Sequence, residues 1–159
     1  MLVDIVVDTN VFAHCSNAIE PRAEAALEFI RKLLAGSEKL CVDPGFHMNE
    51  ALNKSIIGHE YLTHLPFGTL GAAAVAALAG SLRVVELPRR PSTRGIKKKV
   101  DQLVKDKGGD RTFVGVASNS TERVFVSHDY ADFSTNVRKA LLKEVNVCVI
   151  SAEKCMARL

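Results

Sequence analysis

The sequence predicts an α/β fold in which a mostly parallel sheet of four to five strands carries helices on both faces. Short apolar runs, typical of strands buried on both sides, alternate along the whole chain with segments of helical spacing. Several of the runs end at acidic residues, and parallel sheets gather functional groups beyond the carboxyl ends of their strands. With 159 residues, the chain is expected to form a single domain spanning residues 1–159.

Five strands are expected. The first, at residues 2–7, is almost continuously apolar before it stops at Asp8, which suits a strand with two covered faces. Asp4 is the exception and is placed at the start of this strand. The other four runs are expected at residues 39–42, 82–87, 123–127 and 146–150.

The helices follow from spacing and from their end signals. In the segment 21–36, Phe29, Ile30 and Leu33 fall on one face, with Pro21 at the start and Gly36 at the end. A helix containing Glu50 is expected after the turn at 43–45, whereas residues 58–67 are expected to be irregular. Further helices are expected at 71–79, from a cap at Ser92 to about 107, from Asp110 to about 117, at 137–142 and from 152.

Composition excludes some classes of protein. The most apolar segment, 70–82, is shorter than the ~20 residues of a membrane-spanning helix, and the N-terminal residues lack the pattern of a signal peptide. The four cysteines form no CxxC pair, as expected of reduced thiols in a cytoplasmic protein. A net charge of +3 permits a polyanionic partner without requiring one.

Four acids recur at element boundaries. Asp8 and Asp129 follow the first and fourth strands, Glu50 lies beyond the second, and Asp110 opens a helix. Carboxylates gathered at one rim repel one another unless a cation is present. Hard divalent cations such as Mg²⁺ prefer oxygen ligands, so the pattern predicts a site for Mg²⁺ or Mn²⁺.

The residues that carry these acids resemble a known family. Val6-Val7-Asp8-Thr9-Asn10-Val11 is similar to the opening motif of PIN (PilT N-terminus) domains, and the later acids occur in the family's order. The resemblance spans residues 3 to about 150 and includes the run Ser127 to Phe133. It implies a PIN-like three-layer fold and a metal-dependent endoribonuclease, often the toxin of a VapC-like toxin–antitoxin pair.

The resemblance assigns roles to particular residues. Asp8, Glu50, Asp110 and Asp129 would be the catalytic acids that bind one or two metal ions. Asp132 competes with Asp129 for the fourth place. The side chains expected to orient these acids are Thr9, Asn10, Ser127 and Asp132. Two segments depart from the family pattern, Asp43-Pro44-Gly45 and Gly108-Gly109, so the toxin identity is less specific than the domain.

The expected partners are RNA, an antitoxin protein and a second copy of the chain in a homodimer. The proposed RNA contacts are the basic residues Arg89, Arg90, Arg94, Lys97, Lys98 and Lys99. One alternative is a PIN-like domain that binds RNA or serves as a scaffold without cleaving, and another is an RNA-processing nuclease outside any toxin–antitoxin pair. A phosphotransfer protein fits less well, because a dehalogenase-like phosphatase needs an aspartate where Asn10 stands.

Overall fold

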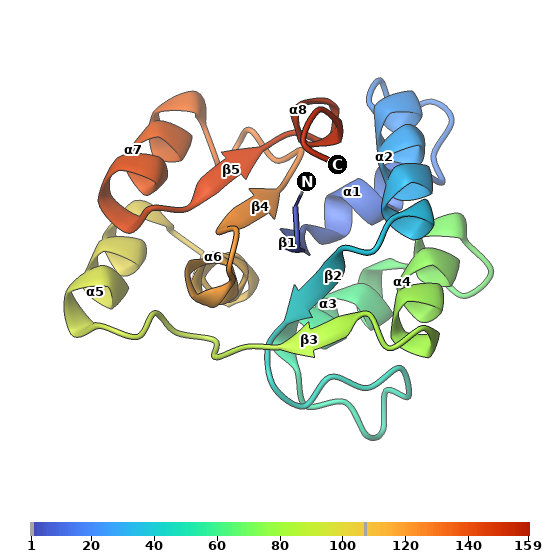
Figure 1. The fold of residues 1–159 in the computed structure, drawn as a ribbon, viewed down its shortest axis with the longest axis horizontal. Helices are drawn as coiled ribbons and strands as arrows, with labels where there is room; N and C mark the ends of the chain where they lie inside the picture. The colour runs from blue at the N-terminus through green and yellow to red at the C-terminus, as the bar shows by residue number, and fades with distance from the viewer. Residues whose placement is uncertain (1, 107) are drawn as a thin grey trace.

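The protein is a three-layer α/β domain built on one parallel sheet, as the computed structural model shows for residues 2–106 and 108–159 (Figure 1). The described strands form a five-stranded sheet in the order β3-β2-β1-β4-β5, and every pairing between neighbours is parallel. The expected fold class is therefore confirmed. The strands are β1 (Asp4–Val7), β2 (Lys39–Val42), β3 (Val84–Glu86), β4 (Val124–Val126) and β5 (Cys148–Ile150).

Helices cover both faces of the sheet. In Figure 1, α5, α6 and α7 lie to the left of the strands, and α2, α4 and α8 lie to the right. The helices in the described residues are α1 (Thr9–His14), α2 (Ala23–Ala35), α3 (Ile56–His64), α4 (Leu70–Gly80), α5 (Arg94–Leu103), α6 (Gly109–Asn119), α7 (Thr135–Val145) and α8 (Ala152–Met156).

The core lies on both sides of the central strands β1 and β4. All four residues of β1 and all three of β4 are buried, as expected for strands with two covered faces. On the α6 side, aromatic rings form a continuous chain with centroids 5.2–6.3 Å apart. The chain runs through Phe12, Tyr61, Phe113, Phe125 and Phe133.

The segment after β2 differs from the sequence expectation. None of the described helices includes Glu50, which lies in an exposed turn, and α3 occupies Ile56–His64, where the sequence predicts irregular structure. Gly58 stands inside this helix. A Cβ at that position would lie 2.3 Å from the side-chain oxygen of Asn53, so a larger residue there would displace the Asn53 side chain.

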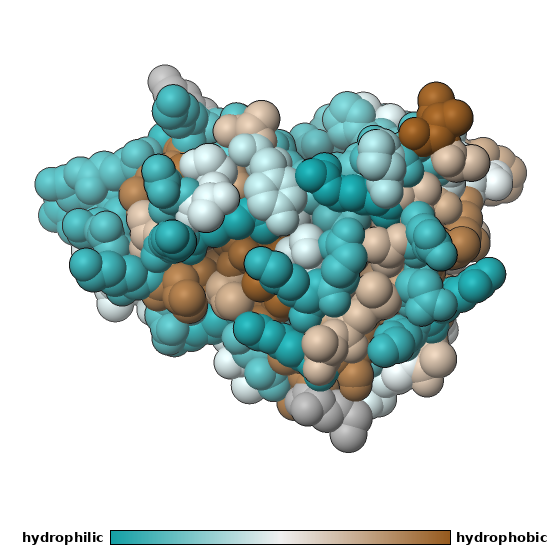
Figure 2. Space-filling model, turned by 90° about the horizontal axis from the view of Figure 1, so that it is seen from above, coloured by the Kyte–Doolittle hydropathy of each residue, from teal (hydrophilic) through white to brown (hydrophobic). Residues whose placement is uncertain are grey.

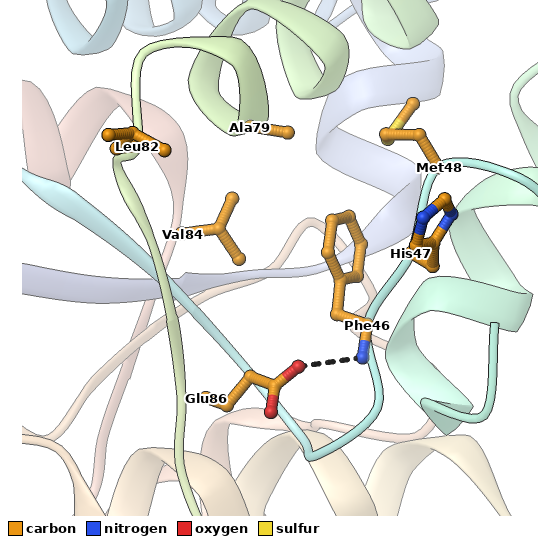
Figure 3. Close-up of a pocket in the computed structure, with 7 residues that line it drawn as sticks. All are labelled: Phe46, His47, Met48, Ala79, Leu82, Val84 and Glu86. Carbon is orange, nitrogen blue, oxygen red and sulfur yellow. Dashed lines mark hydrogen bonds between the residues drawn. The ribbon is translucent and has the colours of Figure 1, made fainter. Parts of the chain in front are cut away.

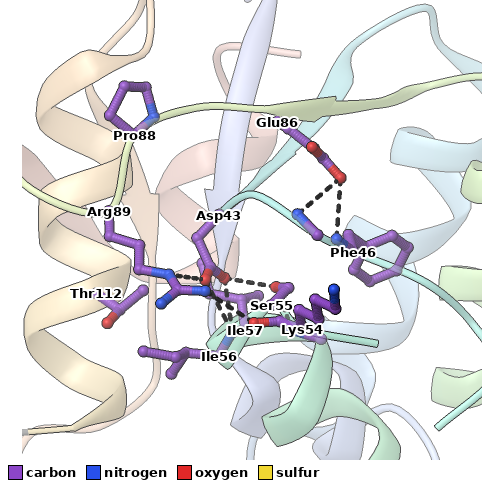
Figure 4. A network of polar contacts seen from close by, with 12 residues as sticks. Asp43, Phe46, Lys54, Ser55, Ile56, Ile57, Glu86, Pro88, Arg89 and Thr112 are labelled. Atoms are coloured by element: carbon purple, nitrogen blue, oxygen red, sulfur yellow. Dashed lines mark hydrogen bonds and ion pairs between the residues drawn. The ribbon is translucent and has the colours of Figure 1, made fainter. Parts of the chain in front are cut away.

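A buried aspartate explains where α3 begins. Asp43 is fully buried at the end of β2, and its carboxylate accepts hydrogen bonds from the backbone N–H groups of Ile56 and Ile57, both at 2.8 Å (Figure 4). The Ser55 hydroxyl and the Arg89 guanidinium, whose Nε lies 2.6 Å away, also donate to it. Asp43 therefore caps α3 across the loop, a negative charge at a helix N-terminus.

The other boundaries agree within a few residues, with α5 ending at Leu103, and the end expected near residue 107 falls on a position outside the described residues. The cap of α5 is Thr93 rather than Ser92, and its hydroxyl accepts the N–H of Ile96. Small residues in α4 allow close packing within the chain, because a Cβ on Gly71 would lie 2.3 Å from the carbonyl oxygen of Phe12. All four cysteines are free thiols. Across the described residues, no helix is both long and apolar enough to span a membrane.

Candidate functional site

Asp8 is the best-positioned acid of the chain. It directly follows β1, is 8% exposed, and its backbone N–H donates to the carbonyl oxygen of Val126 in β4. Because Val7 and Val126 are paired in parallel register, Asp8 and Ser127 leave the sheet side by side. The Ser127 hydroxyl donates to Asp8 Oδ2 at 2.6 Å, and the Asn10 amide donates to the same oxygen at 2.9 Å.

The environment of Asp8 disfavours its ionised form. The pKa of Asp8 is raised from 3.8 to about 6, mainly by burial and to a smaller extent by the charge of Asp129. The hydrogen bonds from Ser127 and from the first residues of α1 oppose this rise. Asp8 is thus a carboxylate whose charge is only partly compensated by its hydrogen-bond donors.

Asp110 lies in the first turn of α6 and is half-buried. Its pKa is raised from 3.8 to about 7, first by burial and then by the charge of Asp8. Asp106, Asp129 and Asp132 also raise this pKa. Asp8, Asp110, Asp129 and Asp132 therefore share one rim, together with Asp106, which the sequence did not single out.

The loop after β4 distinguishes Asp129 from Asp132. Asp129 is half-buried and its charge acts on both Asp8 and Asp110, whereas Asp132 is exposed and acts on Asp110. One oxygen of Asp129 accepts the N–H groups of Ala131 and Asp132, at 2.8 and 2.9 Å, so this carboxylate also shapes its own loop. Burial and the effect on Asp8 favour Asp129, although Asp132 acts more strongly than Asp129 on Asp110.

Two of the residues expected to orient Asp8 hold it in place. Asn10 bridges the elements, because its amide nitrogen binds Asp8 while its oxygen accepts the backbone N–H of His128 at 3.1 Å. Ser127 does the same, since it donates to Asp8 and accepts the N–H of Asp129 at 3.0 Å. Thr9 is different: its hydroxyl is buried without a hydrogen-bond partner among the described residues.

A histidine pair supports the rim, although the sequence did not predict it. His128 and His14 stack with their Nδ1 atoms 3.0 Å apart, and His128 Nε2 accepts the N–H of Ala152 at 3.2 Å. Burial lowers the pKa of His128 to about 4 and also lowers that of His14. The pair is therefore neutral at pH 7. No pattern in the sequence links these residues, which are 114 positions apart.

Neither Glu50 nor Glu60 is among the charges that act on Asp110. Glu50 lies in the exposed turn before α3, and its expected position over the sheet edge depended on a helix that is absent from the described residues. Another glutamate stands beside the rim. Glu60, on α3, is close enough to α6 that a Cβ on Gly109 would lie 3.4 Å from its carboxyl group. Its other neighbour is His64, at 3.5 Å.

The rim acids supply the oxygen ligands that a hard cation prefers, but their side chains are not arranged around a single metal position. Across the described residues, no Lys, Arg or His nitrogen lies within 4.0 Å of the carboxylates of Asp8, Asp110 or Asp129. Within the same residues, no three Asp, Glu, His or Cys side chains stand in positions that could hold a metal ion together. A cation bound here would compensate the charge of the acids.

The predicted basic run is partly neutralised. Arg89 binds Asp43, Arg90 lies 3.4 Å from Asp101, and Lys99 lies 2.7 Å from Glu144. The remaining residues of the run, Arg94, Lys97 and Lys98, are exposed on α5. This face offers fewer uncompensated charges to RNA than the sequence suggested.

Comparison with known proteins finds no relative of this chain. No family model matches the chain, and no curated protein or solved structure is significantly similar to it. The interpretation of the site therefore rests on the geometry and charge of its own residues.

The Ser127→Ala variant tests whether Ser127 tunes Asp8. Since the Ser127 hydroxyl stabilises the ionised carboxylate, its removal is expected to raise the pKa of Asp8 above about 6. Carboxyl ¹³C chemical shifts, followed by NMR as a function of pH, measure this directly. Ser118→Ala, at the far end of α6, should leave the Asp8 titration unchanged; an unchanged titration in Ser127→Ala would contradict the assignment.

Proposed function

We propose that this chain is a metal-dependent endoribonuclease that hydrolyses RNA phosphodiester bonds. The observation that carries the proposal is the rim itself, where the buried Asp8 faces the charges of Asp110 and Asp129 and no basic side chain among the described residues pairs with them. Folds seldom assemble such repulsion for stability, whereas Mg²⁺ or Mn²⁺ would relieve it. The resemblance of the Asp8 motif to PIN domains supports the same function.

Each rim residue has a role in this proposal. Asp8 and Asp110 would bind the metal, and Asp129 would complete the ligand set. Asn10 and Ser127 would keep Asp8 oriented, as hydrogen-bonded partners of metal ligands commonly do. The bound metal would supply an activated water and would stabilise the developing negative charge on the phosphate. The low exposure of Asp8 strengthens its electrostatic interaction with a bound cation.

The experiment combines metal binding with RNA cleavage. Calorimetric titration of the purified chain with MnCl₂ should show saturable binding, and single-stranded RNA should be cleaved internally with Mg²⁺ or Mn²⁺ but not with EDTA. Saturable binding without cleavage would favour the alternative, a PIN-like domain that holds RNA as a scaffold. Absence of both would contradict the proposed site.

We further propose that Glu60, rather than Glu50, supplies the glutamate of the site. The Glu60→Gln variant is expected to weaken Mn²⁺ binding and RNA cleavage about tenfold, because the carboxylate adjoins the start of α6. Glu50→Gln, in the exposed turn, is the matched control and should change neither by more than about twofold. Calorimetry and cleavage rates of both variants give the comparison, and a larger loss in Glu50→Gln would return the role to Glu50.

We also propose that the chain forms a homodimer and binds an antitoxin protein, and that it acts in the cytoplasm. Support comes from apolar surface around β3 and α4. A pocket of about 470 Å³ lies beside β3, with Phe46, Met48, Leu82 and Val84 along it (Figure 3). A second pocket, of about 460 Å³, adjoins the fully exposed Phe67. Exposed apolar patches of this kind mark protein contacts.

Expression in a bacterial host distinguishes a toxin from a processing nuclease. A toxin should arrest growth and degrade cellular RNA, and coexpression of a neighbouring small open reading frame should relieve the arrest. Normal growth with intact bulk RNA would favour a processing nuclease outside any toxin–antitoxin pair.

A further inference from the structure

A second polar feature lies beside the acidic rim. A crevice of about 240 Å³ runs between α7 and the edge strand β5. Leu142 and Val149 line it, together with Tyr130 and a group of basic residues. Figure 2 shows the side of the molecule that carries α7 and α8, where hydrophobic residues are visible between hydrophilic ones. We call this feature the basic crevice.

The charge of the basic crevice is opposite to that of the rim. Arg138, Lys139 and Lys154 line it, and none of the described acidic residues does. Among the described residues, no carboxylate oxygen lies within 4.0 Å of their side-chain nitrogens. The nearest acid in sequence, Glu153, approaches His128 instead. The crevice therefore presents the exposed charges of Lys139 and Lys154 to an anion, whereas the charge of Arg138 is also attracted by Asp129 and Asp8.

The crevice and the rim are fixed to the same loop. The Arg138 guanidinium donates to the carbonyl oxygens of Ser127 and Asp129, at 3.1 and 2.9 Å, and to that of Phe133 at 2.7 Å. Its central carbon lies 4.0 Å from the ring centroid of Tyr130, and Arg22 approaches the same ring at 5.0 Å. Tyr130 is thus held between the acids and the crevice.

The size of the crevice limits what it can hold. Pockets for drug-sized ligands measure about 300–1,000 Å³, so about 240 Å³ suits a phosphate with its sugar rather than a whole nucleotide. The hydroxyls of Thr135 and Ser151 also line it and can bind sugar or phosphate oxygens. These dimensions and charges match one backbone unit of a nucleic acid strand.

We infer that the basic crevice binds a backbone phosphate of single-stranded RNA next to the bond placed at the acidic rim. That the bound nucleic acid is RNA rests on the proposed function. Because Asp129 and Tyr130 are adjacent, a strand bound in the crevice passes directly to the acids. The RNA track therefore follows α7 and β5 instead of the α5 face favoured by the sequence.

The test measures RNA binding without cleavage. Fluorescence anisotropy with a labelled 12-nucleotide single-stranded RNA, in EDTA, compares the full chain with the double variant Lys139→Gln/Lys154→Gln. Affinity is expected to fall about tenfold at 0.1 M salt, and the slope of log K against log salt should decrease by about 0.7 for each phosphate that the variant no longer neutralises. Lys97→Gln/Lys98→Gln on α5 is the matched control, with the same change in charge.

The outcomes separate this inference from the proposed function. Equal losses in both double variants would show a nonspecific charge effect and overturn the inference, as would unchanged affinity in Lys139→Gln/Lys154→Gln. Cleavage by the wild-type chain with unchanged binding in that variant would overturn the inference alone. A selective loss of binding without any cleavage would support the crevice and reject the nuclease. If a mononucleotide displaced the labelled RNA as effectively as unlabelled RNA does, the crevice would be a site for free nucleotides. That result would overturn the inference that it binds an RNA strand.

Discussion

The Asp8→Asn variant is expected to lose metal-dependent RNA cleavage by at least roughly a hundredfold. Loss of a residue that only supports a metal ligand lowers metal affinity or activity about 10- to 100-fold. Loss of Asp8, a metal ligand itself in this proposal, is therefore expected to lower activity by more than that. Asparagine is close to isosteric and can still accept the hydrogen bond from Ser127. The change therefore removes the charge while it preserves most of the local packing.

The same variant is expected to be more stable than the wild type at pH 7. The pKa of Asp8 is raised from 3.8 to about 6 in the folded state, so the folded protein binds this proton more tightly than the unfolded chain does. The penalty for ionisation is therefore absent below pH 4, grows between pH 4 and 6, and is constant above that range. The two pKa values correspond to about 3 kcal/mol.

Urea unfolding between pH 3.5 and 7.5 measures this gain, which should vanish at the acidic end. Added Mn²⁺ should narrow the gap at pH 7, since a ligand present at 100 times its Kd stabilises the wild type by about 2.7 kcal/mol. Glu28→Gln removes an exposed carboxylate on α2 and should alter neither cleavage nor stability. Full cleavage by Asp8→Asn would remove Asp8 from the mechanism. A loss of stability at pH 7 would show that its charge is compensated in the folded protein.

The parts of the fold that could be predicted are those set by local pattern. The buried run before Asp8, the helical spacing of Phe29, Ile30 and Leu33, and the acid at the start of α6 all lie where the sequence indicated. Parallel strands then bring the ends of β1 and β4 together without further information. The association of Asp8, Asp110 and Asp129 follows from that topology.

The errors concern interactions between residues distant in sequence. The start of α3 depends on Asp43, which lies 13 residues before Ile56 and caps its N–H group. Gly58 lies inside the resulting helix, where a Cβ would come within 2.3 Å of the side-chain oxygen of Asn53. The cap at Asp43 places the helix after Ser55 and leaves Glu50 in the exposed turn before it.

The Asp43→Ala variant is expected to destabilise the protein by about 3 kcal/mol. It removes the acceptor for two backbone N–H groups of α3 and leaves Ser55 and Arg89 without their buried partner. Breaking a fully buried ion pair costs about 3–5 kcal/mol, and the 40% exposure of Arg89 places this one at the lower end. The midpoint of thermal unfolding should fall by roughly 6–12 °C.

Two further variants separate the contributions of charge and capping. Asp43→Asn retains an acceptor oxygen but not the charge, so it should be destabilised by less than Asp43→Ala. Asp101→Ala removes the exposed partner of Arg90 and should cost less than about 1 kcal/mol. Because α3 carries Glu60, folded Asp43→Ala should bind Mn²⁺ at most about tenfold more weakly than the wild type, which is the loss expected for Glu60→Gln. A complete loss of Mn²⁺ binding by folded Asp43→Ala would instead make Asp43 a member of the site, and α3 would then be positioned by a metal ligand rather than by a structural ion pair.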